Sequence, residues 1–150
     1  MEKARILIVD DTPDIVRTLE LLFQQKYEII TATDGFIGFT KALKYLPDLI
    51  ILDIMMPKMT GYQFCDQLKK NPDVQNTPIV FLSAKGTKMD QDYGIKKGAA
   101  AYLSKPFEPK ELIDVVTELL IQNPPIKKNR PSYEQILVDE SREKKVSWRG

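Results

Sequence analysis

The sequence of 150 residues contains no histidine, a single cysteine and no long hydrophobic run. Without histidine the chain cannot form a Ser-His or Cys-His nucleophile pair or a histidine metal site, so any phosphohistidine chemistry must come from another protein. Cys65 alone cannot form an internal disulfide, which predicts a reducing compartment. The apolar runs fall far short of the roughly 20 residues that a membrane span requires. Because the N-terminus leads directly into a strand pattern, no signal peptide is expected and the predicted location is cytoplasmic.

What is present is an ordinary globular composition. The chain is 43% hydrophobic and 29% charged, which predicts a buried core rather than disorder. Its net charge of +1 predicts no strong attraction to nucleic acid or to a membrane surface. The length fits one domain with a short tail.

Five short apolar segments alternate with helical patterns along the chain. The predicted strands cover residues 5–9, 27–31, 49–52, 78–82 and 100–104. Apolar residues at helical spacing follow each of them, in 15–23, 36–46, 64–68, 89–97 and 112–120. Such alternation predicts an α/β fold with a parallel sheet and helices on both faces. We expect a flavodoxin-like, doubly wound (βα)5 three-layer sandwich with the five strands in the order 2-1-3-4-5.

Local signals refine the helices. Thr12 is expected to cap the first helix, and Thr60 with Gln63 forms the pattern of a capping box before the third. Phe36, Phe39, Leu43 and Leu46 mark the second helix, which is expected to be entered through Asp34-Gly35 and to end before Pro47.

Acidic residues follow the first and third strands. Asp10 and Asp11 come directly after the first strand, and Asp53 follows the third. In the expected strand order these two strands are neighbours, so their carboxyl ends place the three carboxylates together. Carboxylates at that spacing repel one another, and a divalent cation such as Mg²⁺ would relieve the repulsion.

The fourth and fifth strands add a hydroxyl and a cation. Ser83 follows the fourth strand, and Lys105 with Pro106 follows the fifth. A metal site, an ammonium group, a hydroxyl and a carboxylate nucleophile are the groups that phosphoryl transfer requires. Asp53 is the expected nucleophile, because carboxylates form aspartyl-phosphate intermediates.

These residues, in this order at the ends of successive strands, resemble the receiver domain of two-component response regulators, which has the CheY-like form of the flavodoxin-like fold. The resemblance covers about residues 4–122 and rests on Asp10-Asp11, Asp53, Ser83 and Lys105-Pro106. It implies that Asp53 accepts a phosphoryl group from a sensor histidine kinase or a histidine phosphotransfer protein.

The resemblance also implies a role for each residue. Mg²⁺, with Mn²⁺ as an alternative ion, would be held by Asp11, by Asp10 mostly through water, by Asp53 and by the backbone carbonyl of Met55. Lys105 would contact the phosphate, and the Lys105–Pro106 peptide is usually cis in the family.

The same resemblance implies a switch rather than a turnover enzyme. Ser83 would move toward the phosphoryl group, and Tyr102 would turn inward in response. The face formed by the fourth helix, fifth strand and fifth helix would then change and control a downstream effector. The family also allows a homodimer through that face. Met55 and Lys85, at the mouth of the site, tune the access of water and leave the lifetime of the phosphoaspartate open.

Alternative interpretations remain open. Asp10 and Asp11 could only cap the first helix, Ser83 could be a commonplace serine after a strand, and Lys105 could be a solvated surface lysine. A phosphohydrolase with an aspartyl nucleophile is the rival function; such enzymes usually carry a second Asp two residues after the nucleophile, where this chain has Met55. The kinase, the stimulus and the output are not specified by the sequence.

The C-terminal segment differs from the rest. The receiver-like domain is expected to end near residue 123, which leaves 124–150 as a linker or tail with seven basic and four acidic residues, a net charge of +3. We expect a solvated linker rather than a nucleic-acid contact. Ser132 and Gln135 could cap a helix bearing Tyr133, Ile136 and Leu137, but that apolar stripe is too short for a stable isolated helix. The chain could therefore be the receiver portion of a longer regulator.

Overall fold

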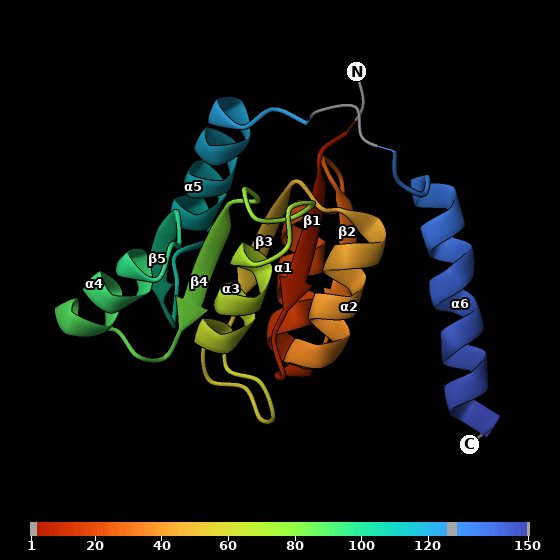
Figure 1. The fold of residues 1–150 in the computed structure, drawn as a ribbon, viewed down its shortest axis with the longest axis horizontal. Coiled ribbons are helices and arrows are strands. Elements are labelled where there is room, and N and C mark those ends of the chain that lie inside the picture. Colours follow the sequence, from red (N-terminus) through yellow and green to blue (C-terminus); the bar gives the residue numbers. More distant parts are fainter. Residues whose placement is uncertain (1–2, 126–128, 150) are drawn as a thin grey trace.

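A parallel sheet covered by helices on both faces forms the body of the protein (Figure 1). The computed structural model describes residues 3–125 and 129–149. Its strands are β1 (Arg5–Val9), β2 (Glu28–Ala32), β3 (Leu49–Leu52), β4 (Ile79–Ser83) and β5 (Ala101–Ser104). Its helices are α1 (Pro13–Phe23), α2 (Gly35–Tyr45), α3 (Gly61–Lys69), α4 (Lys88–Lys96), α5 (Pro109–Gln122) and α6 (Tyr133–Arg149). None of the helices within these residues is both long and apolar enough to cross a membrane.

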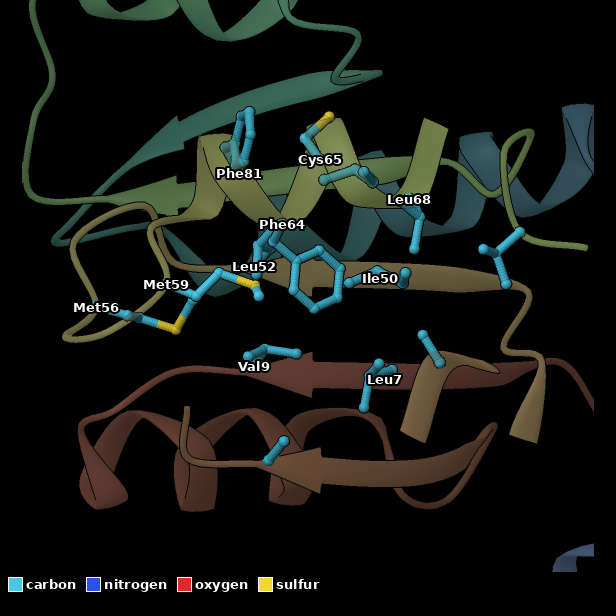
Figure 2. Packing of buried hydrophobic residues seen from close by; sticks show 14 of the residues in the cluster. Leu7, Val9, Ile50, Leu52, Met56, Met59, Phe64, Cys65, Leu68 and Phe81 are labelled. Atoms are coloured by element: carbon cyan, nitrogen blue, oxygen red, sulfur yellow. The ribbon is translucent and has the colours of Figure 1, made fainter. Parts of the chain in front are cut away.

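The strand order is β2-β1-β3-β4-β5, and every pair is parallel, which confirms the predicted fold. The central strands are continuous apolar runs because both of their faces are covered. Leu7 and Val9 of β1 point to the side of α2 and α3, whereas Ile6 and Ile8 point to the side of α1 and α5. Figure 2 shows the first of these cores, with Phe64 of α3 packed between the strands and the loop that carries Met56 and Met59.

The second helix is confirmed, and Phe39 packs against the core, but not all of the residues that mark the helix are buried. Phe36 is 57% exposed and Leu43 is 37% exposed, whereas Leu46 lies beyond the helix as its C-cap. The buried residues of α2 are Gly35, Gly38, Ala42 and Tyr45. Glycine occupies positions 35 and 38 because the first turn of the helix lies very close to its neighbours: a Cβ at position 38 would come within 2.8 Å of the Val9 side chain.

The capping predictions have mixed outcomes. The capping box of α3 is confirmed: the Thr60 hydroxyl accepts from the Gln63 N–H at 3.2 Å, and the Gln63 side chain accepts from the Thr60 N–H at 2.9 Å. At α1 the position is confirmed, because Thr12 is the N-cap residue and Pro13 is the first residue of the helix, but the Thr12 side chain makes no capping hydrogen bond. The carboxylate of Asp10 instead accepts a hydrogen bond from the Thr12 N–H at 2.9 Å.

The segment after residue 123 contains a long helix that contacts the rest of the protein. Ile136 of α6 is 1% exposed and belongs to the core shared by β1, β3 and α3. The hydroxyl of Tyr133 accepts from the Ile29 N–H and donates to the Ile29 carbonyl, on the edge strand β2. The predicted boundary near residue 123 stays a prediction, but the helix is not isolated, and this explains how a short apolar stripe suffices. Two of the predicted basic residues of the tail, Lys127 and Lys128, lie outside the described residues.

Candidate functional site

Two acidic residues meet at the carboxyl ends of β1 and β3. These strands pair in parallel with Val9 opposite Leu52, so Asp10 and Asp53 each lie one residue beyond a paired position. The N–H of Asp53 donates to the Val9 carbonyl at 2.9 Å, which fixes the two strand ends to each other. Carboxylate oxygens of Asp10, Asp11 and Asp53 lie within 4.8 Å of one another. The three carboxylates that the sequence singled out therefore form one cluster that could hold a metal ion.

The members of this cluster differ in exposure. Asp10 and Asp53 are 2% and 4% exposed, whereas Asp11 is open to solvent. The Asp10 carboxylate also accepts from the N–H of Thr12, the N-cap residue of α1, and this bond holds the carboxylate in the turn between β1 and the helix. Buried carboxylates require compensation by hydrogen bonds or by positive charge.

Lys105 supplies positive charge from the end of β5. Its Nζ lies 2.7 Å from Asp10 Oδ2 and 3.6 Å from Asp53 Oδ2. The Lys105 N–H donates to the Ser83 carbonyl at 2.8 Å, which fixes the lysine at the end of the β4–β5 pair. The Lys105–Pro106 peptide is cis. One ammonium group thus bridges two of the carboxylates in the cluster.

The environment disfavours the charged form of Asp53. Burial raises the pKa of the Asp53 carboxyl to about 6, and the neighbouring charge of Asp10 adds to this effect. Lys105 and the Met55 N–H, which donates to Asp53 Oδ1 at 3.3 Å, lower the pKa but do not offset the rise. A cation bound among the carboxylates would stabilise the charged form, and oxygen ligands of this kind suit Mg²⁺. The donor set therefore fits a hard divalent ion.

This pKa shift predicts a stabilising substitution. In metal-free buffer at pH 7.5, Asp53→Asn is expected to raise the free energy of unfolding by about 1–2 kcal/mol, because the cost of a buried carboxylate is removed. The folded pKa of Asp53 lies above its unfolded value of 3.8, so this gain is full above about pH 6 and disappears as the pH falls toward 4. Urea denaturation at several pH values measures the effect.

The matched control for that experiment is Asp92→Asn, a substitution of an exposed aspartate on α4. It should leave the free energy of unfolding within about 0.5 kcal/mol of wild type. Mg²⁺ should stabilise the wild type and have a much smaller effect on Asp53→Asn, because a ligand that binds only the folded state adds to its stability. A loss of stability in Asp53→Asn would contradict the argument.

Ser83 and Tyr102 meet at the loop between β4 and α4. Ser83 is fully buried, and its Oγ accepts a hydrogen bond from the Lys85 N–H at 3.2 Å. Half-buried Tyr102 packs against Phe81, with 6.2 Å between ring centroids, and its hydroxyl donates to the Lys85 carbonyl. Burial raises the pKa of the Tyr102 hydroxyl. Among the described residues neither side chain has a hydrogen bond to the acid cluster, so the structure joins both to the loop rather than to Asp53.

One supporting residue of the site went unnoticed in the sequence. Gly61, the first residue of α3, lies directly against the site: a Cβ there would come within 2.7 Å of the Asp53 carbonyl oxygen. Its N–H donates to the Ile54 carbonyl at 3.0 Å, which closes the loop that follows Asp53. A glycine directly after a capping threonine was the available signal, because a residue without a Cβ permits close backbone approach.

Comparisons with known proteins agree with this geometry. The family model described as response regulator receiver domain matches residues 6–117. The chain is 45% identical over 112 residues to the probable transcriptional regulator ycf27 of Pyropia yezoensis, which covers 74% of this chain and 45% of that protein. It is 35% identical over 147 residues to the response regulator PleD of Caulobacter vibrioides, which covers 97% of this chain and 30% of that protein. The chain spans about half the length, or less, of these two curated relatives.

Solved structures show the same likeness. The chemotaxis protein CheY4 of Vibrio cholerae superposes with a TM-score of 0.75 at 33% sequence identity. The superposition covers 79% of this chain and the whole of that one.

Proposed function

Because this chain belongs to the response regulator receiver domain family of two-component signalling, we propose that Asp53 is its phosphoacceptor. The observation that carries the proposal is the meeting of Asp10, Asp11 and Asp53 within 4.8 Å, with Lys105 Nζ 3.6 Å from the Asp53 carboxylate. In the proposed reaction an oxygen of Asp53 attacks the phosphorus atom of a phosphohistidine, and the bond from phosphorus to the imidazole nitrogen breaks. The chain lacks histidine, so the donor is a histidine kinase or a histidine phosphotransfer protein.

The acid cluster is the proposed magnesium site. Asp11 and Asp53 would hold the ion directly, Asp10 mostly through water, and the backbone carbonyl of Met55 would complete the protein ligands; Mn²⁺ is the alternative ion. Bound there, the ion would neutralise the charge of the transferring phosphoryl group. Burial, together with the neighbouring charge of Asp10, raises the pKa of Asp53 to about 6, and this supports the assignment because a charged Asp53 there requires a positive partner.

The remaining residues act on the phosphoryl group from the sides. Lys105 is proposed to contact a phosphoryl oxygen with its ammonium group, which already lies beside both buried carboxylates. Ser83 would leave its bond to the Lys85 N–H and donate to another phosphoryl oxygen. Since Tyr102 binds the carbonyl of the same residue, a shift of the β4–α4 loop would release it. The α4-β5-α5 face is the surface that this rearrangement would alter.

We propose a phosphorylation-dependent switch with slow self-dephosphorylation, and not an enzyme that turns over a separate substrate. Its partners would be the phosphodonor and a downstream effector, and a homodimer through the α4-β5-α5 face is the alternative use of that surface. Residues 1–123 would be the phosphoacceptor unit, and residues 124–150 an extension toward the output. The rival function, a phosphohydrolase with Asp53 as nucleophile, is disfavoured because Met55 occupies the position where such enzymes usually carry an acid.

The test is phosphorylation by a small donor with and without metal. Incubation with acetyl phosphate and Mg²⁺ is expected to add one phosphoryl group per chain, in the peptide that contains Asp53, as measured by mass spectrometry. Removal of Mg²⁺ with EDTA should slow the labelling by about 100-fold or more, because the phosphoryl charge then lacks its main counter-charge. Labelling unaffected by EDTA would contradict the proposed metal site. Sustained hydrolysis of an aryl phosphate would favour the phosphohydrolase.

A further inference from the structure

Helix α6 is attached to two parts of the receiver. Its first turn is bound to the sheet: Tyr133 bonds to both backbone groups of Ile29 on β2, and Ile136 is buried. Its next turns are bound to α2. Lys41 Nζ donates to Glu140 Oε2 at 2.8 Å and to the Thr31 carbonyl at 2.8 Å. The docking of α6 therefore depends on the position of α2.

The two ion pairs between α6 and α2 differ in strength, and the stronger one is incompletely paired. Lys44 lies 3.9 Å from Asp139, which is a loose and partly exposed ion pair. The other carboxylate oxygen of Glu140, Oε1, is buried and has no hydrogen-bond partner among the described residues. An unpaired buried oxygen costs free energy, so Lys41 and Glu140 hold α6 less firmly than a fully paired contact would. The polar contacts between α6 and α2 therefore stabilise the docked position only weakly.

The same helix α2 rests on the loop that follows Asp53. A Cβ on Gly35, at the start of α2, would lie 2.7 Å from the Cβ of Met59, so the helix is in direct backbone contact with that loop. Phe36, Phe39, Lys58 and Met59 line one cavity of about 460 Å³ between α2 and the loop. Phe36 also lines a second cavity, of about 320 Å³, which α2 shares with Glu143 of α6. In Figure 1 the C-terminal end of α6 lies at the same end of the molecule as the loop between β3 and α3.

The start of this loop is tied to the reacting carboxylate. The Met55 N–H donates to Asp53 Oδ1 at 3.3 Å. Formation of an acyl phosphate on Asp53 withdraws charge from that acceptor and adds a phosphoryl group at the base of the loop, so the contacts of the loop with α2 must change. We propose that phosphorylation of Asp53 loosens the docking of α6 on the β2–α2 face, through the loop and α2. This inference rests on the proposed function of Asp53. It assigns a second surface that responds to phosphorylation, at the β2 edge of the sheet, in addition to the α4-β5-α5 face at the β5 edge.

Hydrogen exchange of the full chain tests the proposal, with beryllofluoride and Mg²⁺ as the phosphoryl mimic. Peptides from residues 50–60 report occupancy of the site, and peptides from residues 137–149 report the docking of α6. Saturating beryllofluoride is expected to slow exchange in the first region and to accelerate it about fivefold or more in the second.

Linkage makes the test reciprocal. Glu140→Gln weakens the docking of α6 independently of phosphorylation. If phosphorylation also weakens the docking, this variant must bind beryllofluoride more tightly than wild type, by about fivefold. The matched control Asp139→Asn removes only the loose pair and should change that affinity less than about twofold. Occupied sites with unchanged or slowed exchange in α6 would overturn this inference alone. Failure of beryllofluoride to protect residues 50–60, together with failure of acetyl phosphate to label the chain, would overturn the proposed function as well.

Discussion

Replacing Asp53 by asparagine is expected to reduce the labelling of this protein by acetyl phosphate to below about one-hundredth of the wild-type rate. An amide has no carboxylate oxygen to attack phosphorus. Asp10, the other buried carboxylate of the cluster, is already engaged by the Lys105 ammonium group at 2.7 Å and by the Thr12 N–H at 2.9 Å. The measurement is the time course of phosphoryl incorporation, by intact-mass spectrometry, at saturating Mg²⁺.

The loss cannot be attributed to unfolding, because the same substitution is expected to stabilise the metal-free protein. Asp92→Asn serves again as the control and should be labelled at the wild-type rate. Labelling of Asp53→Asn at the wild-type rate would place the phosphoacceptor elsewhere and would refute the function proposed here. Slow residual labelling of Asp10 or Asp11 would be distinguished by the mass of the labelled peptide.

The central strands could be predicted from the sequence because nearly all of their residues are apolar and buried. Leu49–Leu52, for example, is apolar throughout, and every residue in it is buried. Such a run can be recognised as a buried strand without knowing which strands lie beside it. The position of Asp53 at the end of this run then follows from the general rule for parallel sheets. The sequence does not predict that Lys105 lies closer to Asp10 than to Asp53. Such side-chain distances depend on tertiary packing, which the spacing of residues along the chain does not specify.

Helix α2 shows where periodicity misleads. Phe36 and Leu43 are more hydrophobic than Gly35 and Gly38, so a count of apolar residues favours the wrong face. The sheet and the loop at Met59 approach so closely that only residues without large side chains fit between them. Close backbone contact is a tertiary requirement, and in the sequence it appears only as two glycines three residues apart.

Helix α6 was underestimated for a different reason. The expectation of an unstable helix considered the helix alone, whereas its stability comes from Ile136 in the core and from Tyr133 on the edge of β2. Arg130, just before the helix, reaches the start of β3 at Asp48. These partners are more than 80 residues away in the chain, so no local pattern reveals them.

Asp48 is where we expect the largest loss of stability. Its carboxylate accepts from both terminal nitrogens of Arg130 at 3.2 Å, and its Oδ2 also accepts from the Arg5 N–H at 2.7 Å. Arg130 is itself nearly buried, and it donates to the Leu46 carbonyl at 2.6 Å. Asp48→Ala would leave a buried guanidinium without its counter-charge, and it should lower the free energy of unfolding by about 3–5 kcal/mol. Urea denaturation measures this loss, and Asp73→Ala, at an exposed acid in the α3–β4 loop, is the control.

A double-mutant cycle separates the lost pair from other consequences of the substitution. Asp48→Ala combined with Arg130→Ala removes both charges, so the double variant should be more stable than the sum of the two single losses predicts, by about 1–3 kcal/mol. Arg130→Ala alone also tests the role of the extension, because a purely solvated linker after residue 123 would contribute nothing at this position. If neither single substitution lowers the stability more than the Asp73→Ala control, the extension is not part of the folded unit and the docking of α6 described here is wrong.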